Sequence, residues 1–134
     1  MNLKVYWKMN ELENLMIYKQ YIELIYYTEN ITIKYPKSEK LSLVTSIKNN
    51  TYEGMKKIIL AQKEYTKSKR IIILNELDTD LKMLKVLIRI SYKSKYINSK
   101  NYAAWSKKIF NISNLLGAWI NSCLKQSRIA IIKS

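Results

Sequence analysis

The sequence predicts an all-α fold, an antiparallel four-helix bundle with up-down-up-down topology. Only two glycines and one proline occur in 134 residues, which leaves few residues for the tight turns of an all-β fold. Apolar residues recur at alternating spacings of three and four along four long segments, as they do in helices that bury one face. Short breaks separate the segments, and short connections join antiparallel neighbours. We expect one domain over residues 1–134, because this length suits a single core.

The first predicted helix spans about residues 10–34 and is followed by Pro36. Proline disfavours helix at the residue before it, and Ser38 can cap the next helix. Residues 15–27, LMIYKQYIELIYY, are apolar or aromatic on nearly every side. One face can enter the bundle, and the remainder leaves a patch of the kind that marks an interface, so we expect self-association. The alternative is scattered exposure of tyrosines, whose hydroxyl groups tolerate water.

Two further helices are expected over residues 38–66 and 68–94. Each carries a seam of core residues, spaced as in bundle helices. The seam of the second helix consists of Val44, Ile47, Thr51, Gly54, Ile58, Ala61 and Tyr65. The seam of the third helix consists of Leu74, Leu77, Leu81, Leu84 and Ile88. Gly54 is therefore expected to face the core.

The fourth predicted helix spans residues 100–125, after a break in which Asn98 or Ser99 can act as N-cap. Its seam consists of Tyr102, Trp105, Ile109, Ile112, Leu116, Trp119 and Cys123. Gly117 lies about 100° from this seam and borders the core. Glycine inside a helix costs about 1 kcal/mol relative to alanine. Gly117 either relieves crowding beside Trp119 or allows contact with a second subunit.

The composition disfavours catalysis and metal binding. The chain has no histidine and one cysteine, Cys123, so neither a nucleophile with its base nor a set of metal ligands can be assembled. We expect no enzyme activity, no metal and no cofactor. A single cysteine cannot form an intramolecular disulfide, which suits a reducing cytoplasm. The charged start and the absence of a run of about 20 apolar residues predict a soluble, cytoplasmic protein that does not span a membrane.

The charge predicts a polyanionic partner. Lysine and arginine number 24 against 10 acidic residues, and the net charge is +14. The alternative is a bias of AT-rich coding sequence, which inflates lysine. Lys82, Lys85, Arg89 and Lys93 are spaced three, four and four, and form a ridge on the third helix, here called the basic ridge. The other candidate contact residues are Lys56, Lys57, Lys69 and Arg70 near the second connection, with Lys107 and Lys108 on the fourth helix.

Any one of these clusters can be just a solvated helix face. Together, with few acidic residues between them, they favour binding of phosphates through counterion release. The pattern shows no aromatic platform on the basic faces, so we expect little preference among nucleic-acid sequences.

Residues 81–122, LKMLKVLIRISYKSKYINSKNYAAWSKKIFNISNLLGAWINS, resemble the C-terminal half of the accessory variability determinant (Avd) proteins of diversity-generating retroelements. The marks are a third helix rich in leucine and basic residues, a tyrosine in the fourth helix, and LLGAWI, which is similar to the leucine-glycine-small-tryptophan pattern of the family. Residues 29–50, ENITIKYPKSEKLSLVTSIKNN, resemble its first connection and the start of its second helix. The resemblance covers about residues 15–122.

The resemblance implies a small basic four-helix bundle that assembles into a homopentameric barrel. It also implies binding of the retroelement's reverse transcriptase and template RNA, and possibly DNA, in support of mutagenic copying, without catalysis by the subunit itself. Basic residues of the family match Lys85 and Arg89. Lys85 stands where arginine is common, and lysine lacks the bidentate fork of arginine.

Two other functions stay open at this point. Proteins encoded by intervening sequences of 23S ribosomal RNA share the family's fold, so a structural bundle without a reverse-transcriptase partner is the main alternative. A basic helical protein at anionic membranes is the weaker one.

Overall fold

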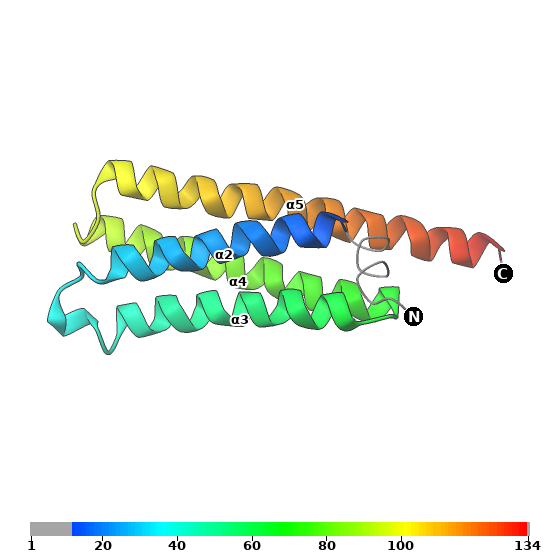
Figure 1. The fold of residues 1–134 in the computed structure, drawn as a ribbon, viewed down its shortest axis with the longest axis horizontal. Coiled ribbons are helices and arrows are strands. Elements are labelled where there is room, and N and C mark those ends of the chain that lie inside the picture. Colours follow the sequence, from blue (N-terminus) through cyan, green and yellow to red (C-terminus); the bar gives the residue numbers. More distant parts are fainter. Residues whose placement is uncertain (1–11, 134) are drawn as a thin grey trace.

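The computed structural model of the chain describes the backbone of residues 12–133 and the side chains of residues 16–125. This part of the chain forms four long helices and one short 3-10 helix, with no strand. In chain order they are α2 (Leu12–Thr32), η1 (Lys37–Glu39), α3 (Leu43–Lys63), α4 (Lys67–Lys93) and α5 (Ser99–Lys133). Successive helices run in opposite directions, and α5 extends past its neighbours (Figure 1). α2 and α4 each pack against α3 and α5, so the described helices form the expected antiparallel four-helix bundle.

The predicted seams form the core. The seam residues of α3, α4 and α5 are buried, with two exceptions. Tyr65 is 81% exposed, because α3 ends at Lys63 and the helical spacing no longer applies. Tyr102 is half-buried and packs at the edge of the core. None of the described helices has both the length and the apolar character needed to cross a membrane.

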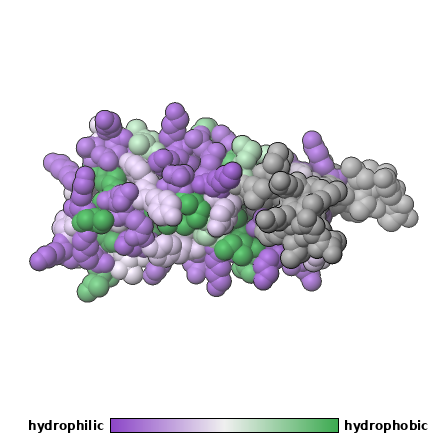
Figure 2. Space-filling model, in the orientation of Figure 1, coloured by the Kyte–Doolittle hydropathy of each residue, from purple (hydrophilic) through white to green (hydrophobic). Residues whose placement is uncertain are grey.

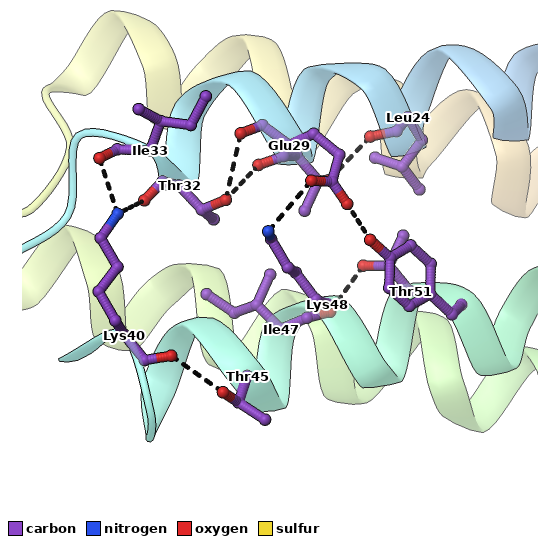
Figure 3. A network of polar contacts seen from close by, with 11 residues as sticks. Leu24, Glu29, Thr32, Ile33, Lys40, Thr45, Ile47, Lys48 and Thr51 are labelled. Atoms are coloured by element: carbon purple, nitrogen blue, oxygen red, sulfur yellow. Dashed lines mark hydrogen bonds and ion pairs between the residues drawn. The ribbon is translucent and has the colours of Figure 1, made fainter.

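The connection between α2 and α3 differs from the expected one. The helix predicted from Ser38 begins instead at Leu43, and Ser38 lies within η1. The Lys40 ammonium explains this, because its Nζ donates to the carbonyl oxygens of Thr32 and Ile33, each at 2.7 Å (Figure 3). These carbonyls end α2 without intrahelical partners, and the lysine satisfies them. Residues 33–42 are thereby held as a connection.

The connection between α4 and α5 follows standard capping rules. Asn98 is confirmed as the N-cap of α5, since its Oδ1 accepts a hydrogen bond from the Asn101 N–H at 2.7 Å. No proline or glycine follows Lys125, and α5 continues to Lys133, past the predicted end.

Gly54 allows α2 and α3 to approach. The Tyr21 hydroxyl donates to the Thr51 carbonyl at 2.6 Å, and a Cβ on Gly54 would lie 1.9 Å from that hydroxyl oxygen. Burial, and to a lesser extent the charge of Asp80, raises the pKa of Tyr21, so its hydroxyl stays protonated and able to donate. Gly54 therefore makes room for a buried interhelical hydrogen bond.

Gly117 has a different environment. Apart from its own helical turns, a Cβ at Gly117 meets no heavy atom of the described residues within 4 Å. The explanation that Gly117 relieves crowding beside Trp119 is therefore wrong for the described part of the chain. Contact with a second subunit stays a prediction.

Candidate nucleic-acid interface

The basic ridge lies on the outer surface of α4. Lys82, Lys85, Arg89 and Lys93 are all exposed, beside the buried seam of the same helix. Eleven residues separate its ends, so it extends over about 16 Å. Lys82 forms an ion pair with Asp78 at 2.5 Å, but its side chain is 70% exposed, and such exposed pairs are weak and easily exchanged. Among the described residues, the other three cations have no carboxylate within ion-pair distance.

An apolar stripe runs next to the basic ridge. Met83, Val86 and Ile90 each follow a ridge residue directly, so they lie about 100° further round α4. They are 45%, 50% and 46% exposed. The outer face of α4 therefore presents cations along one side and aliphatic groups along the other.

Arg70 does not belong to this basic surface, which corrects the expectation from the sequence. It is only 6% exposed. Its Nε donates to the Ala61 carbonyl at 2.8 Å, and its guanidinium also donates to the Glu64 carbonyl. Carbonyls at a helix C-terminus lack intrahelical partners, and a basic side chain there also interacts favourably with the helix dipole. Arg70 thus fastens the end of α3 to the start of α4.

Lys57 also forms an ion pair within the bundle. Its Nζ lies 2.5 Å from Asp80, and the two side chains are only 19% and 15% exposed. A partner that took Lys57 would leave a half-buried carboxylate unpaired. Lys57 therefore does not present a free cation, whereas Lys56 and Lys69 are exposed and stay candidate contact residues.

One of the two candidates on α5 lies apart from the basic ridge. Lys108 is half-buried, and its Nζ lies 5.3 Å from the centre of the Tyr27 ring of α2, a cation–π contact. α2 is diagonal to α4 in the bundle. Lys107 is exposed. The structure therefore places Lys108 beside α2, away from the basic ridge on α4.

The basic ridge ends at a pocket that the sequence reading missed. The turn between α4 and α5 surrounds an open depression of about 610 Å³, lined by Tyr92, Lys93, Lys95, Tyr96, Ile97 and Asn98. Its signal in the sequence is YKSKY, residues 92–96, in which two tyrosines flank two lysines. The sequence pattern showed no aromatic platform on the basic faces, whereas the structure brings two tyrosines, Tyr92 and Tyr96, together with two lysines in this pocket.

Lys95 holds an unusual backbone conformation at the rim of this pocket. Its φ is 65°, the only positive φ of a non-glycine among the described residues. The Tyr96 N–H donates to the Ser91 carbonyl and the Lys95 N–H to the Tyr92 carbonyl, at 3.0 Å each, which is the Schellman pattern that ends many helices. Glycine is usual at this position, and another residue costs about 1 kcal/mol there.

Further lysines lie at the same end of the bundle. The α2–α3 and α4–α5 connections both lie there (Figure 1), and hydrophilic side chains cover much of it (left in Figure 2). Lys34 and Lys37 are exposed in the first of these connections. No cluster of three or more His, Cys, Asp or Glu residues that could hold a metal occurs in the described part of the chain, and Cys123 is buried.

A sequence model of the bAvd-like family matches residues 15–123. The chain belongs to the bAvd-like family. The match covers most of α2, all of α3 and α4 and most of α5, and includes every candidate contact residue. The resemblance to Avd proteins is thereby confirmed.

A solved structure supports the fold of this bAvd-like chain. It is the crystal structure of a protein of unknown function from the S23 ribosomal protein family of Bacteroides thetaiotaomicron, with 14% sequence identity and a TM-score of 0.75. The alignment covers 82% of this chain and 99% of that chain. At this identity the likeness shows a shared fold. No curated protein sequence matches significantly.

Proposed function

We propose that this bAvd-like chain is a non-catalytic accessory subunit of a diversity-generating retroelement. In this role it binds the retroelement's reverse transcriptase and template RNA, and supports mutagenic reverse transcription. Family membership supports the accessory role. The observation that carries the binding proposal is the basic ridge, which lies on α4 inside the matched range and whose cations are exposed.

The ridge is suited to phosphate groups. Its side chains are exposed, and lysine and arginine can lay their apolar stems along a neighbouring apolar flank while their charged ends stay in solvent. Each phosphate neutralised by such a cation releases counterions, so affinity falls steeply with salt. Lys85 contributes a point charge, whereas Arg89 can bind a phosphate or a carboxylate with two parallel hydrogen bonds. The same surface therefore suits RNA, DNA and acidic groups of a reverse transcriptase.

We further propose that the chain self-associates, with five subunits as the family resemblance implies. Large apolar side chains remain exposed on the outer faces, among them Tyr26 at 61% and Phe110 at 57%. On the face in Figure 2, hydrophobic residues form separate patches among hydrophilic ones. A second copy that covers the stripe on α4 or the open space at Gly117 would bury such groups.

Charge reversal on the ridge tests the proposed function. We expect the double variant Lys85→Glu, Arg89→Glu to keep its fold, because exposed substitutions usually change stability by about 0.5 kcal/mol or less. Two carboxylates opposite a phosphate backbone repel it, so RNA affinity should fall at least about tenfold. The measurement is RNA binding by fluorescence anisotropy at several salt concentrations, with capture of the cognate reverse transcriptase in parallel.

The matched control is Lys19→Glu, Lys125→Glu, which makes the same change in net charge at two exposed lysines on α2 and α5 that are not candidate contact residues. We expect this control to bind much more strongly than the ridge variant. Equal loss in both would show that net charge alone matters, and undiminished binding by the ridge variant would remove the site assignment. A parent chain that captures neither RNA nor reverse transcriptase would favour the structural role instead.

A further inference from the structure

The pocket at the α4–α5 turn combines two chemical features that the basic ridge lacks. Two tyrosine rings line it, and two lysines, Lys93 and Lys95, stand at its edge. Lys93 is also the last residue of the ridge, so a strand that follows the ridge toward the C-terminal end of α4 reaches the pocket. Position and charge thus connect the pocket with the proposed phosphate surface.

The ring of Tyr92 is held in place yet accessible. It stacks on Tyr102 of α5, with ring centres 4.6 Å apart and planes inclined by 27°. Tyr92 is nevertheless 40% exposed and lines the pocket. A ring that a neighbour fixes on one side loses little freedom when a flat ligand stacks on it, so the pair forms a prepared platform.

Tyr96 also lines the pocket. It is half-buried, and its ring centre lies 5.5 Å from that of the buried Tyr35. The pocket wall is therefore anchored to the bundle core. Aromatic walls with nearby cations suit a flat, electron-rich group attached to an anion, and a nucleotide has both parts.

The turn that ends α4 places Lys95 among the residues that line the pocket. Lysine occupies a left-handed position, φ 65°, where glycine fits without strain. The two hydrogen bonds of the Schellman pattern fix this conformation and with it the position of Lys95. The Lys95 ammonium is exposed at the rim, in reach of an anionic group beside the pocket.

We propose that this pocket binds an unpaired base of a single-stranded nucleic acid, which stacks on Tyr92 while flanking phosphates contact Lys93 and Lys95. The proposal rests on the proposed nucleic-acid binding and adds a preference for single strands. Bases inside a duplex are paired and stacked on each other, so they cannot offer a free face to a tyrosine. The basic ridge would hold either form, and the pocket would hold only the single-stranded one.

The test compares two substitutions at one position. Tyr92→Leu removes the aromatic ring, and Tyr92→Phe keeps the ring but removes the hydroxyl group. The probes are single-stranded RNA and DNA of about 12 nucleotides and a duplex RNA of equal length, measured by fluorescence anisotropy. We expect Tyr92→Leu to bind single strands about tenfold more weakly and the duplex as the parent does, with Tyr92→Phe close to the parent throughout. Loss with RNA alone would assign the pocket to RNA, and loss with both to single strands in general.

A direct signal of stacking keeps the test decisive if Tyr92→Leu disturbs the packing of Tyr102. The same single-stranded RNA with one 2-aminopurine loses fluorescence when that base stacks on an aromatic ring. Quenching by the parent and by Tyr92→Phe supports the proposal, and no quenching at any position along the probe overturns it.

Other outcomes separate this proposal from the proposed function. Salt-sensitive RNA binding that Tyr92→Leu leaves unchanged overturns the pocket and leaves the ridge standing. Equal weakening of single strands and duplex assigns Tyr92 a structural role and also overturns the pocket. Weaker capture of reverse transcriptase with unchanged RNA binding makes the pocket a protein contact instead. No binding of any nucleic acid by the parent overturns both proposals.

Discussion

The position of the Tyr21 side chain in the described core requires a glycine at position 54. The tyrosine is 1% exposed and its hydroxyl reaches across to the backbone of α3, so the ring cannot move aside cheaply. The space it occupies is the space where a side chain at position 54 would begin. A single hydrogen atom in place of a methyl group therefore decides whether α2 can lie this close to α3.

We expect Gly54→Ala to lower the free energy of unfolding by about 1–3 kcal/mol, because overpacking in a core has that cost and the Tyr21 hydrogen bond is displaced. The matched control is Gly117→Ala, which makes the same chemical change on another helix but meets open space. It should raise stability by up to about 1 kcal/mol through helix propensity. Urea unfolding at one fixed protein concentration measures both, and equal shifts in the two variants would contradict the assignment of Gly54.

At the scale of elements, α2 and α3 are joined by a polar network on their outer flank (Figure 3). Glu29 of α2 forms an ion pair with Lys48 at 3.1 Å and accepts a hydrogen bond from the Tyr52 hydroxyl. The Tyr52 hydrogen bond is the main reason that the pKa of Glu29 is lowered, with Lys48 adding to it. The same hydrogen bond raises the pKa of Tyr52.

A carboxyl group whose pKa is lowered by folding stabilises the fold above its unfolded pKa, and this contribution is lost as the pH falls through the lowered value. The relevant window therefore lies below the ordinary value of 4.5. We expect Tyr52→Phe to raise the pKa of Glu29 toward that value and to reduce the loss of stability on acidification. NMR titration of the Glu29 carboxyl carbon measures the shift, with Thr45→Ala as a control nearby. An unchanged titration would show that Lys48 alone sets the pKa.

Buried threonine and serine hydroxyl groups of the described helices donate to carbonyls of their own helix. Thr28, Thr32 and Thr51 each donate to the carbonyl four residues earlier at 2.8 Å, and Ser91 does so at 3.0 Å. A hydroxyl group that donates to its own helix needs no hydrogen-bond partner on another helix. Small polar residues can therefore occupy core positions of this bundle without unpaired groups.

Helical periodicity made the helices predictable from the sequence. The connections between them were less predictable. Seam positions follow from the spacing of apolar residues, and that spacing is a property of one helix. The end of α2 depends on Lys40, which reaches back from the following segment to carbonyls seven and eight residues earlier. No local pattern in the sequence marks such a contact, so the start of α3 was placed too early.

The basic surface was partly predictable for the same reason. The ridge follows from spacing alone, whereas Lys57 is removed from the surface by Asp80 on another helix, which requires the register of two helices. Arg70 carried a signal that could have been used, because it stands four residues before Leu74 and so lies in register with the seam of α4. The pocket exists because the α4–α5 turn brings Tyr92 and Tyr96 close to each other. The spacing of residues in the sequence does not reveal the shape of a turn.

At the scale of the whole molecule, Gly117 gives a test of self-association. We expect native mass spectrometry of the parent to show an oligomer, with five subunits. Gly117→Leu adds bulk where the described residues leave space, so it should leave the fold of one chain intact and disrupt the oligomer if a second copy packs there.

The control is Asn111→Leu, which adds a similar side chain at an exposed position of α5. This variant should keep the parent's mass. A parent that is a stable monomer at micromolar concentration would remove the proposal of self-association, and an oligomeric Gly117→Leu would place position 117 outside the contact.

The path of the chain around the bundle also bears on how the fold is reached. Three of the four extensive contacts between the described helices join consecutive helices. The fourth joins α2 and α5, where the Tyr27 hydroxyl and the Asn101 carbonyl lie 3.2 Å apart. Hairpins of neighbouring helices close early because the intervening loops are short, and contacts of large sequence separation form late. The chain can therefore assemble α3, α4 and α5 as two successive hairpins. α2 then packs against α3 and α5 in the last step. Helical bundles with such local connectivity fold within about microseconds to milliseconds.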